Sequence, residues 1–277
     1  MKPIFIICQH RTGSTLLKNI LNRNSKVKMA FDEMNLYEPF RKNTLDKLIP
    51  HYINSIDELL KAIDQKQIYG TFWKQFEQSG IDRADLAKSF SKSVRFNEIE
   101  VLSKILSSLA GSENIRPGIK YPVHFSKIGV LAESFKSCRM VFLTRDPRAM
   151  IASKLNDSAT ILRKRKSIFN RFFIHYCTLL YFCIEYVQAQ KKYKEFDRIG
   201  LVIDYEKLVQ DDSCIRKICN FLDIEFESEM LNAEGKKSSF AVKILKHKPI
   251  YKSSNNRYRT ALSRFDQWLI KILTKYK

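Results

Sequence analysis

A strand–turn–helix pattern at the start of the chain constrains its fold more than any other feature. The apolar run Ile4–Cys8 predicts a buried strand, and Ser14–Asn22 has the spacing of an amphipathic helix. The turn between them contains an arginine followed by one glycine flanked by serine and threonine residues, in the order Arg11-Thr12-Gly13-Ser14-Thr15. Such a turn aims backbone N–H groups and a helix dipole at one spot, which favours an anion. We therefore predict a phosphate site; a merely well-capped turn is the alternative.

The loop differs from that of nucleoside triphosphatases. If Gly13 is the second glycine of Gly-x-x-x-x-Gly-Lys-Ser/Thr, the first glycine position is Cys8 and the lysine position is Ser14. The lysine that reaches the outer phosphates is thus absent, which disfavours magnesium-dependent phosphoryl transfer. Arg11 then supplies the positive charge of the loop.

A second strand-to-helix junction carries two arginines. The buried-strand pattern Arg139–Thr144 leads directly into Arg145-Asp146-Pro147-Arg148. Asp146 is a good N-cap and Pro147 suits the first helical position, so we expect a helix that begins at the carboxyl end of the strand. Capping does not explain the arginines, which would lie where ligands of open α/β sheets bind.

These segments resemble the sulfotransferases that use 3′-phosphoadenosine 5′-phosphosulfate (PAPS), particularly the bacterial and carbohydrate-type branch. The resemblance spans residues 3–211 and implies an α/β fold, a three-layer α/β/α domain with a central parallel sheet. It implies that Arg145 and Ser153, eight positions apart, bind the 3′-phosphate of the donor. It also implies a P-loop-like phosphosulfate-binding loop made of Arg11, Thr12, Gly13, Ser14, Thr15 and Leu16.

Two later segments extend the resemblance. After a strand-like run at Ile199–Ile203, the sequence from Asp204 to Asp211 is similar to the Tyr-Glu-x-Leu segment near the last core strand of the family, which brings Tyr205 to the donor site. A basic stretch at residues 252–259 is a looser match to the late loop that folds over the nucleotide in the family. Arg257 is the residue we assign to that loop.

Sulfuryl transfer moves an SO₃ group from a phosphate to an attacking hydroxyl or amine, and it depends mainly on orientation and electrostatics. Arg11 would lie where charge develops on the bridging oxygen. Lys120 is expected to end the strand Gly118–Tyr121 at the same sheet edge and to add a second positive charge. A solvated lysine before a turn is the alternative for Lys120.

Glu33 is the first candidate for the catalytic base. It follows the strand predicted at Lys26–Phe31, and glycan-modifying relatives commonly carry their catalytic glutamate at about this place. Asp32, Glu38 and His124 compete for the role, and a neutral histidine near pH 7 is a competent base.

The chain of 277 residues is long enough for one domain, predicted to span residues 1–277. Residues 39–115 are expected to form a helical insertion that walls the acceptor site, and residues 238–277 a C-terminal basic loop and helix. The helices we expect are Asp57–Asp64, Asp82–Ser91, Glu98–Ala110 with Gly111 as its stop, and Val123–Phe135. Because the first strand begins at residue 3, we expect no signal peptide and a cytoplasmic enzyme.

The net charge of +20 is spread along the whole chain without a recognised nucleic-acid module, so we expect no nucleic-acid partner. A polyanionic acceptor or a membrane surface remains a possible target of this charge. Residues 160–195 begin with four basic residues and then become apolar and aromatic, which favours a packed helix over a peripheral membrane contact. The six cysteines form no Cys-x-x-Cys pair, and we predict no metal site.

The sequence therefore predicts an enzyme that transfers a sulfuryl group from PAPS, as its donor substrate, to a hydroxyl or amine of a carbohydrate or glycolipid acceptor, in line and without a metal. A P-loop-type nucleotide kinase is one alternative, weakened by the absent loop lysine. A non-catalytic protein that binds a nucleotide or polyanion is the other alternative.

Overall fold

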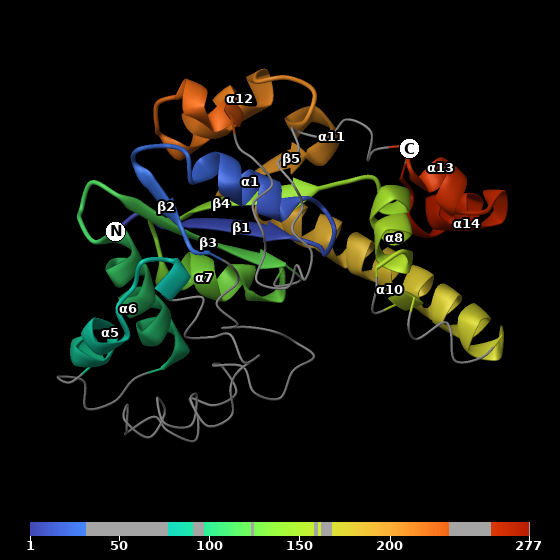
Figure 1. Cartoon of the computed structure of the whole chain (residues 1–277), viewed down its shortest axis with the longest axis horizontal. Helices are drawn as coiled ribbons and strands as arrows, with labels where there is room; N and C mark the ends of the chain where they lie inside the picture. Colours follow the sequence, from blue (N-terminus) through green and yellow to red (C-terminus); the bar gives the residue numbers. More distant parts are fainter. Residues whose placement is uncertain are drawn as a thin grey trace.

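The structure is a computed structural model whose core is one five-stranded sheet with the strand order β2-β3-β1-β4-β5 (Figure 1). All four strand pairings are parallel. The strands are β1 (Ile4–Cys8), β2 (Val27–Met29), β3 (Arg116–Pro122), β4 (Arg139–Thr144) and β5 (Gly200–Asp204). The residues described are 1–31, 77–90, 97–122, 125–157, 160–161, 168–232 and 256–276.

The central strand β1 places the two arginine-bearing junctions side by side. Cys8, the last residue of β1, pairs with Pro122 at the end of β3 and with Leu143 near the end of β4. The chain leaves β1 toward β2 on one side of the sheet and leaves β4 toward β5 on the other. The carboxyl ends of β1 and β4 therefore flank a topological switch point, where open α/β sheets bind their ligands.

Helices cover both faces of the sheet. On one face, apolar side chains of the sheet, including Ile4, Ile6 and Val141, pack on helices α1 (Ser14–Leu21) and α12 (Ser213–Leu222), which lie above the sheet in Figure 1. A one-turn helix, α11 (Tyr205–Leu208), and a 3₁₀ turn, η3 (Ser228–Asn232), complete this layer.

The opposite face of the sheet, including Phe5, Ile7 and Phe142, packs on a second helical layer. This layer contains α5 (Arg83–Phe90), α6 (Glu98–Ala110), the 3₁₀ turn η2 (Phe125–Lys127), α7 (Ile128–Ser134) and the later turns of α10 (Ile168–Glu195). The two layers and the sheet give the three-layer α/β/α arrangement that the sequence predicts.

A third apolar cluster joins α8 (Pro147–Leu155) and α10 to the C-terminal helices α13 (Tyr258–Ala261) and α14 (Arg264–Thr274). Figure 1 shows these helices at one end of the molecule, away from α5 and α6. Among the described residues, no helix is both long and apolar enough to cross a membrane.

Local signals predict several elements well. The strands at Ile4–Cys8 and Arg139–Thr144 have the predicted bounds, and α6 matches the predicted helix Glu98–Ala110. Helix α6 begins at an Asn97 capping box and ends at Gly111 with φ 68°, so both ends are fixed by neighbouring residues.

Other predicted bounds need adjustment. The helix expected from Val123 is a 3₁₀ turn at Phe125–Lys127 that continues into α7. Of the predicted helical insertion, α5 and α6 lie in the described part. The predicted helix Asp57–Asp64 lies outside it.

Candidate functional site

The loop predicted to bind phosphate, called the phosphate loop below, joins β1 to α1 through backbone conformations that few residues adopt. Gly13, the N-cap of α1, has φ 92°, and Arg11 has φ 68°. The first N–H groups of a helix have no partner within the helix, so those of Ser14 and Thr15 can serve an anion. The backbone N–H of Leu16 instead donates to the Gly13 carbonyl over 2.9 Å. The Thr12 hydroxyl donates to the carbonyl of Gln9, so it shapes the turn.

Arg11 joins the loop to the second junction. Its side chain is exposed, and its Nε donates to the hydroxyl of Ser153 over 2.9 Å, across 142 positions of sequence. A non-glycine residue in the left-handed region costs about 1–3 kcal/mol and persists only where the surroundings hold it. The structure thus places together two residues that the resemblance assigned to separate ends of one donor.

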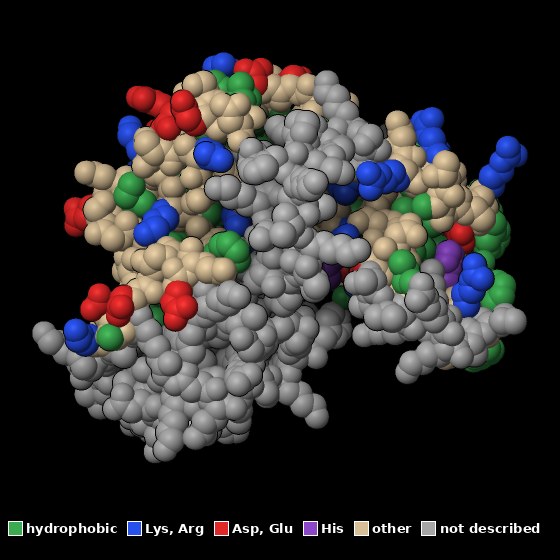
Figure 2. Space-filling view, viewed as in Figure 1, with side chains coloured by type: hydrophobic (Ala, Val, Ile, Leu, Met, Phe, Trp, Pro, Cys, Tyr) green, Lys and Arg blue, Asp and Glu red, His purple; other side chains and the backbone are tan. Residues whose placement is uncertain are grey.

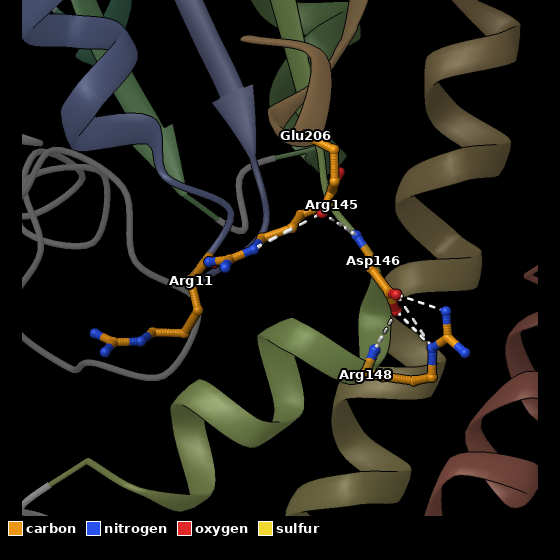
Figure 3. Close-up of polar contacts among 5 residues, drawn as sticks. All are labelled: Arg11, Arg145, Asp146, Arg148 and Glu206. Carbon is orange, nitrogen blue, oxygen red and sulfur yellow. Dashed lines mark hydrogen bonds and ion pairs between the residues drawn. The ribbon is translucent and has the colours of Figure 1, made fainter. Parts of the chain in front are cut away.

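Arg145 makes the second contact between the junctions (Figure 3). Its Nη1 donates to the backbone carbonyl of Arg11 over 3.1 Å, and the residue is only 8% exposed. Burial lowers the pKa of the guanidinium, and the neighbouring Tyr205 and Glu206 oppose that shift. The contact holds Arg11 in its left-handed conformation, so the phosphate loop depends on the end of β4.

Tyr205 lies between the two junctions. The Arg145 guanidinium stacks 4.4 Å from the centre of the Tyr205 ring. The same ring crosses Gly13 so closely that a Cβ atom there would lie 2.3 Å from its Cδ2. Gly13 is therefore required both for its backbone angle and for the space that the ring occupies. The sequence assigned Tyr205 to the donor site through the resemblance alone.

Glu206, in α11 just after the adjacent strand β5, contacts the end of β4. One of its oxygens accepts a hydrogen bond from the Asp146 N–H over 3.2 Å and lies 4.0 Å from Nε of Arg145. Burial raises the pKa of this carboxyl, and the Asp146 N–H and the Arg145 charge act against the rise. The side chains of Tyr205 and Glu206, which follow β5, thus both contact Arg145 and position it.

Arg148 turns away from the switch point, which the sequence did not anticipate (Figure 3). Its guanidinium forms a two-pronged ion pair with the N-cap residue Asp146, with the shortest contact at 2.7 Å. The guanidinium also lies 4.5 Å from the ring of Tyr258 and 5.6 Å from that of Tyr276. Of the two arginines that capping left unexplained, Arg148 ties α8 to the C-terminal segment, and Arg145 faces the loop.

Lys120 is buried and lies two residues before the end of its strand, because β3 continues to Pro122. It pairs in register with Ile6 of β1 and is only 3% exposed. The sequence-based alternative of a solvated lysine before a turn is therefore wrong. Its charge nonetheless acts at the loop, because it is one of the cations that lower the pKa of His10.

His10 precedes Arg11 and is not among the site residues predicted from the sequence. Burial, followed by the charges of Lys154, Lys120 and Arg11, lowers the pKa of His10 to about 4. The imidazole is thus neutral at pH 7, and its low pKa makes it a weak base. Its position in the loop was the only signal in the sequence that could have identified it.

Glu185 of α10 is a buried carboxyl behind the loop. It is 3% exposed, and among the described residues no hydrogen bond of ordinary geometry reaches either of its oxygens. Burial raises its pKa to about 7, and the backbone N–H of His10 opposes the rise. The side-chain amide of Gln9 is likewise buried and unpaired in the described part of the chain. The sequence signal was an acid inside an apolar helical run.

The remaining predicted residues are Arg257, at the start of a C-terminal helix, and four that lie outside the described residues. Arg257 is exposed and forms the N-cap of α13, a helix that packs on α8. Glu33 and His124, with Asp32 and Glu38, lie outside the described residues. Within the described ranges no group of three or more His, Cys, Asp or Glu residues could hold a metal ion.

The fold and the candidate site define an open α/β protein that gathers the Arg11–Thr15 loop and a buried arginine at its switch point. A family model described as "Sulfotransferase family" matches residues 3–228. The chain therefore belongs to the sulfotransferase family. No curated protein matches it significantly.

Solved structures share this fold at low sequence identity. The sulfotransferase domain of the curacin biosynthetic pathway has a TM-score of 0.63 and 16% identity, covering 100% of this chain and 99% of its own. The sulfotransferase domain of the Synechococcus PCC 7002 olefin synthase has a TM-score of 0.59 and 17% identity, and the match covers 100% of this chain and 95% of that domain. Retinol dehydratase, solved with retinol and PAP, has a TM-score of 0.52 and 14% identity, and the match covers 99% of this chain and 81% of the dehydratase.

Proposed function

We propose that the protein transfers a sulfuryl group from PAPS to a hydroxyl or amine of a carbohydrate or glycolipid acceptor. The observation that carries the proposal is the joining of the two junctions: Arg11 contacts Ser153, and Arg145 contacts the Arg11 carbonyl. A donor with phosphate groups at the 3′ and 5′ positions of its ribose needs cations near each other from both junctions, and the proximity of Arg11 and Arg145 supports this assignment. A protein of the same fold was solved with PAP, which supports the choice of donor.

The donor is tested first by binding. Adenosine 3′,5′-bisphosphate should raise the melting temperature in the absence of magnesium, because a ligand that binds only the native state stabilises it by mass action. ATP with magnesium is the matched control, because a kinase would prefer it. Equal or larger stabilisation by ATP with magnesium would favour the kinase alternative.

Arg145 and Arg148 form a matched pair for locating the 3′-phosphate. Arg145→Ala removes a charge-assisted contact, so affinity for adenosine 3′,5′-bisphosphate should fall by about 1.5–3 kcal/mol, and much less for adenosine 5′-monophosphate. Arg148→Ala should lower stability, because it breaks the pair with Asp146, and should leave the ratio of the two affinities unchanged. If both variants lower both affinities equally, Arg145 only supports the fold.

Catalysis in this proposal relies on charge and position. Arg11 and Lys120 stabilise the charge that develops on the leaving phosphate, and the loop holds the donor in line for attack. Glu33 takes the proton of the attacking group, and His124 is the alternative base. His10 is a poor base for this step because its pKa lies near 4.

The base is identified by turnover. Glu33→Gln should lower kcat by about 10²–10⁴ and leave the affinity for adenosine 3′,5′-bisphosphate nearly unchanged, whereas His124→Ala should cost much less. The reverse outcome would assign the base to His124. Radiolabelled PAPS incubated with fractionated glycans and lipids would identify the acceptor class, and labelled product in neither fraction would contradict the proposed acceptors.

A further inference from the structure

Helices α10 and α14 present apolar side chains to solvent at one end of the molecule. At the start of α10, Phe169, Phe172 and Phe173 are 77%, 61% and 58% exposed. On α14, Phe265, Trp268 and Ile272 are 54%, 56% and 52% exposed. We call these six residues the aromatic face. Soluble monomers rarely leave so many large apolar side chains together in water, so such a surface marks an interaction site.

The two helices hold the aromatic face together as one surface. His175 of α10 pairs with Asp266 of α14 at 3.2 Å, and Tyr186 contacts Tyr276 edge to face. The helices therefore run alongside each other over about three turns. Figure 2 shows hydrophobic side chains at this end of the molecule on both sides of a histidine, with lysine and arginine side chains beside them.

Along residues 169–187 and 264–275, the helical segments that carry the aromatic face, the exposed charged side chains have one sign. Before its final turn, α10 has one acidic residue, Glu185, and α14 also has one, Asp266. Both are buried, at 3% and 4% exposure. The exposed charged side chains from 169 to 187 and from 264 to 275 are Arg171, Arg264, Lys271 and Lys275. In the sequence, four consecutive basic residues, 163–166, precede α10; they lie outside the described residues. The partner that complements this surface is therefore both apolar and anionic.

We propose that the aromatic face binds the surface of an anionic lipid bilayer. Phenylalanine and tryptophan enter the boundary between headgroups and acyl chains, while arginine and lysine contact anionic headgroups. A second copy of this chain fits less well, because a symmetric pairing would bring the same basic residues of two chains together. The proposal concerns a surface and stands whether or not the proposed reaction is correct.

The test is cosedimentation of the whole chain with vesicles of phosphatidylcholine alone or mixed with phosphatidylserine. We expect binding to the mixed vesicles that weakens at high salt, since salt screens the charge contribution. Phe172→Ser/Phe173→Ser should weaken binding at least tenfold, and Arg171→Gln/Lys271→Gln by about fivefold for each charge removed. The fluorescence of Trp268, in a Trp73→Phe background, should shift to shorter wavelength on binding.

Matched controls separate the aromatic face from the general charge of the protein. Val130→Ser and Leu231→Ser remove exposed apolar side chains elsewhere, and Lys217→Gln removes an exposed cation of α12. These variants should bind vesicles like the parent. All variants change exposed residues and should keep the parental melting temperature. Equal losses in control and face variants would overturn the proposal. A dimer that Phe172→Ser/Phe173→Ser dissociates, without vesicle binding by the parent, would assign the face to a second copy.

Discussion

Gly13→Ala should destabilise the protein through two separable effects. Gly13 has φ 92°, and an alanine in the left-handed region costs about 1–2 kcal/mol. The added Cβ would lie 2.3 Å from two ring atoms of Tyr205, and forcing such overpacking costs about a further 1–3 kcal/mol. The ring cannot move freely because Arg145 stacks on it. The expected loss in unfolding free energy is therefore about 2–5 kcal/mol in total.

Gly111→Ala is the matched control. Gly111 also has a positive φ, 68°, but a Cβ added there meets nothing within 4 Å. This variant therefore carries the backbone strain without the collision and should cost only about 1–2 kcal/mol. The difference between the two variants measures the contact between the phosphate loop and Tyr205.

Urea denaturation, followed by circular dichroism, measures both losses. A double variant, Gly13→Ala with Tyr205→Leu, should lose about 1–3 kcal/mol less than the sum of the single variants, because the shorter side chain makes room for the new methyl group. Binding of adenosine 3′,5′-bisphosphate by Gly13→Ala should fall by about tenfold or more if the loop shifts. A Gly13→Ala loss equal to that of Gly111→Ala, with additive double-variant energies, would refute the contact.

Three further variants probe the residues around the loop. Burial raises the pKa of Glu185 from 4.5 to about 7, so stability falls by up to about 3 kcal/mol as pH rises between these values. Glu185→Gln should remove that loss. In urea titrations, the variant should have the same unfolding free energy as the parent near pH 4 and exceed it by the full amount near pH 8. Ser153→Ala removes the partner of Arg11 and should weaken binding of adenosine 3′,5′-bisphosphate about tenfold in calorimetry. Lys120→Met should lower kcat by about 10²–10³ in a sulfuryl-transfer assay and change donor affinity little.

The sequence predicts the sheet and its junctions well because their signals are local. An apolar run followed closely by Gly13 fixes β1 and the start of α1, and an apolar run followed by the N-cap Asp146 and by Pro147 fixes β4 and α8. Asp146 caps α8 through the Arg148 N–H, as the prediction of an N-cap requires. The fold and the loop follow from such neighbouring residues.

The details of the site depend on contacts that no local pattern encodes. Arg145 and Arg148 flank the same Asp146-Pro147 pair, yet one faces the loop and the other the C-terminal helices. Tyr258 and Tyr276, which select the second orientation, lie more than a hundred positions downstream. The burial of Lys120 likewise follows from the register between β1 and β3, which is a property of the folded sheet.

Arg11 shows why the site forms only with the completed fold. Its left-handed backbone, φ 68°, is one that an isolated chain rarely populates in a non-glycine residue. The two contacts that hold it come from residues 134 and 142 positions away, on β4–α8. The conformation of the phosphate loop therefore depends on the second junction, and any change that releases Arg145 or Ser153 should also relax the loop. Both ends of the proposed donor site should thus be lost or gained together.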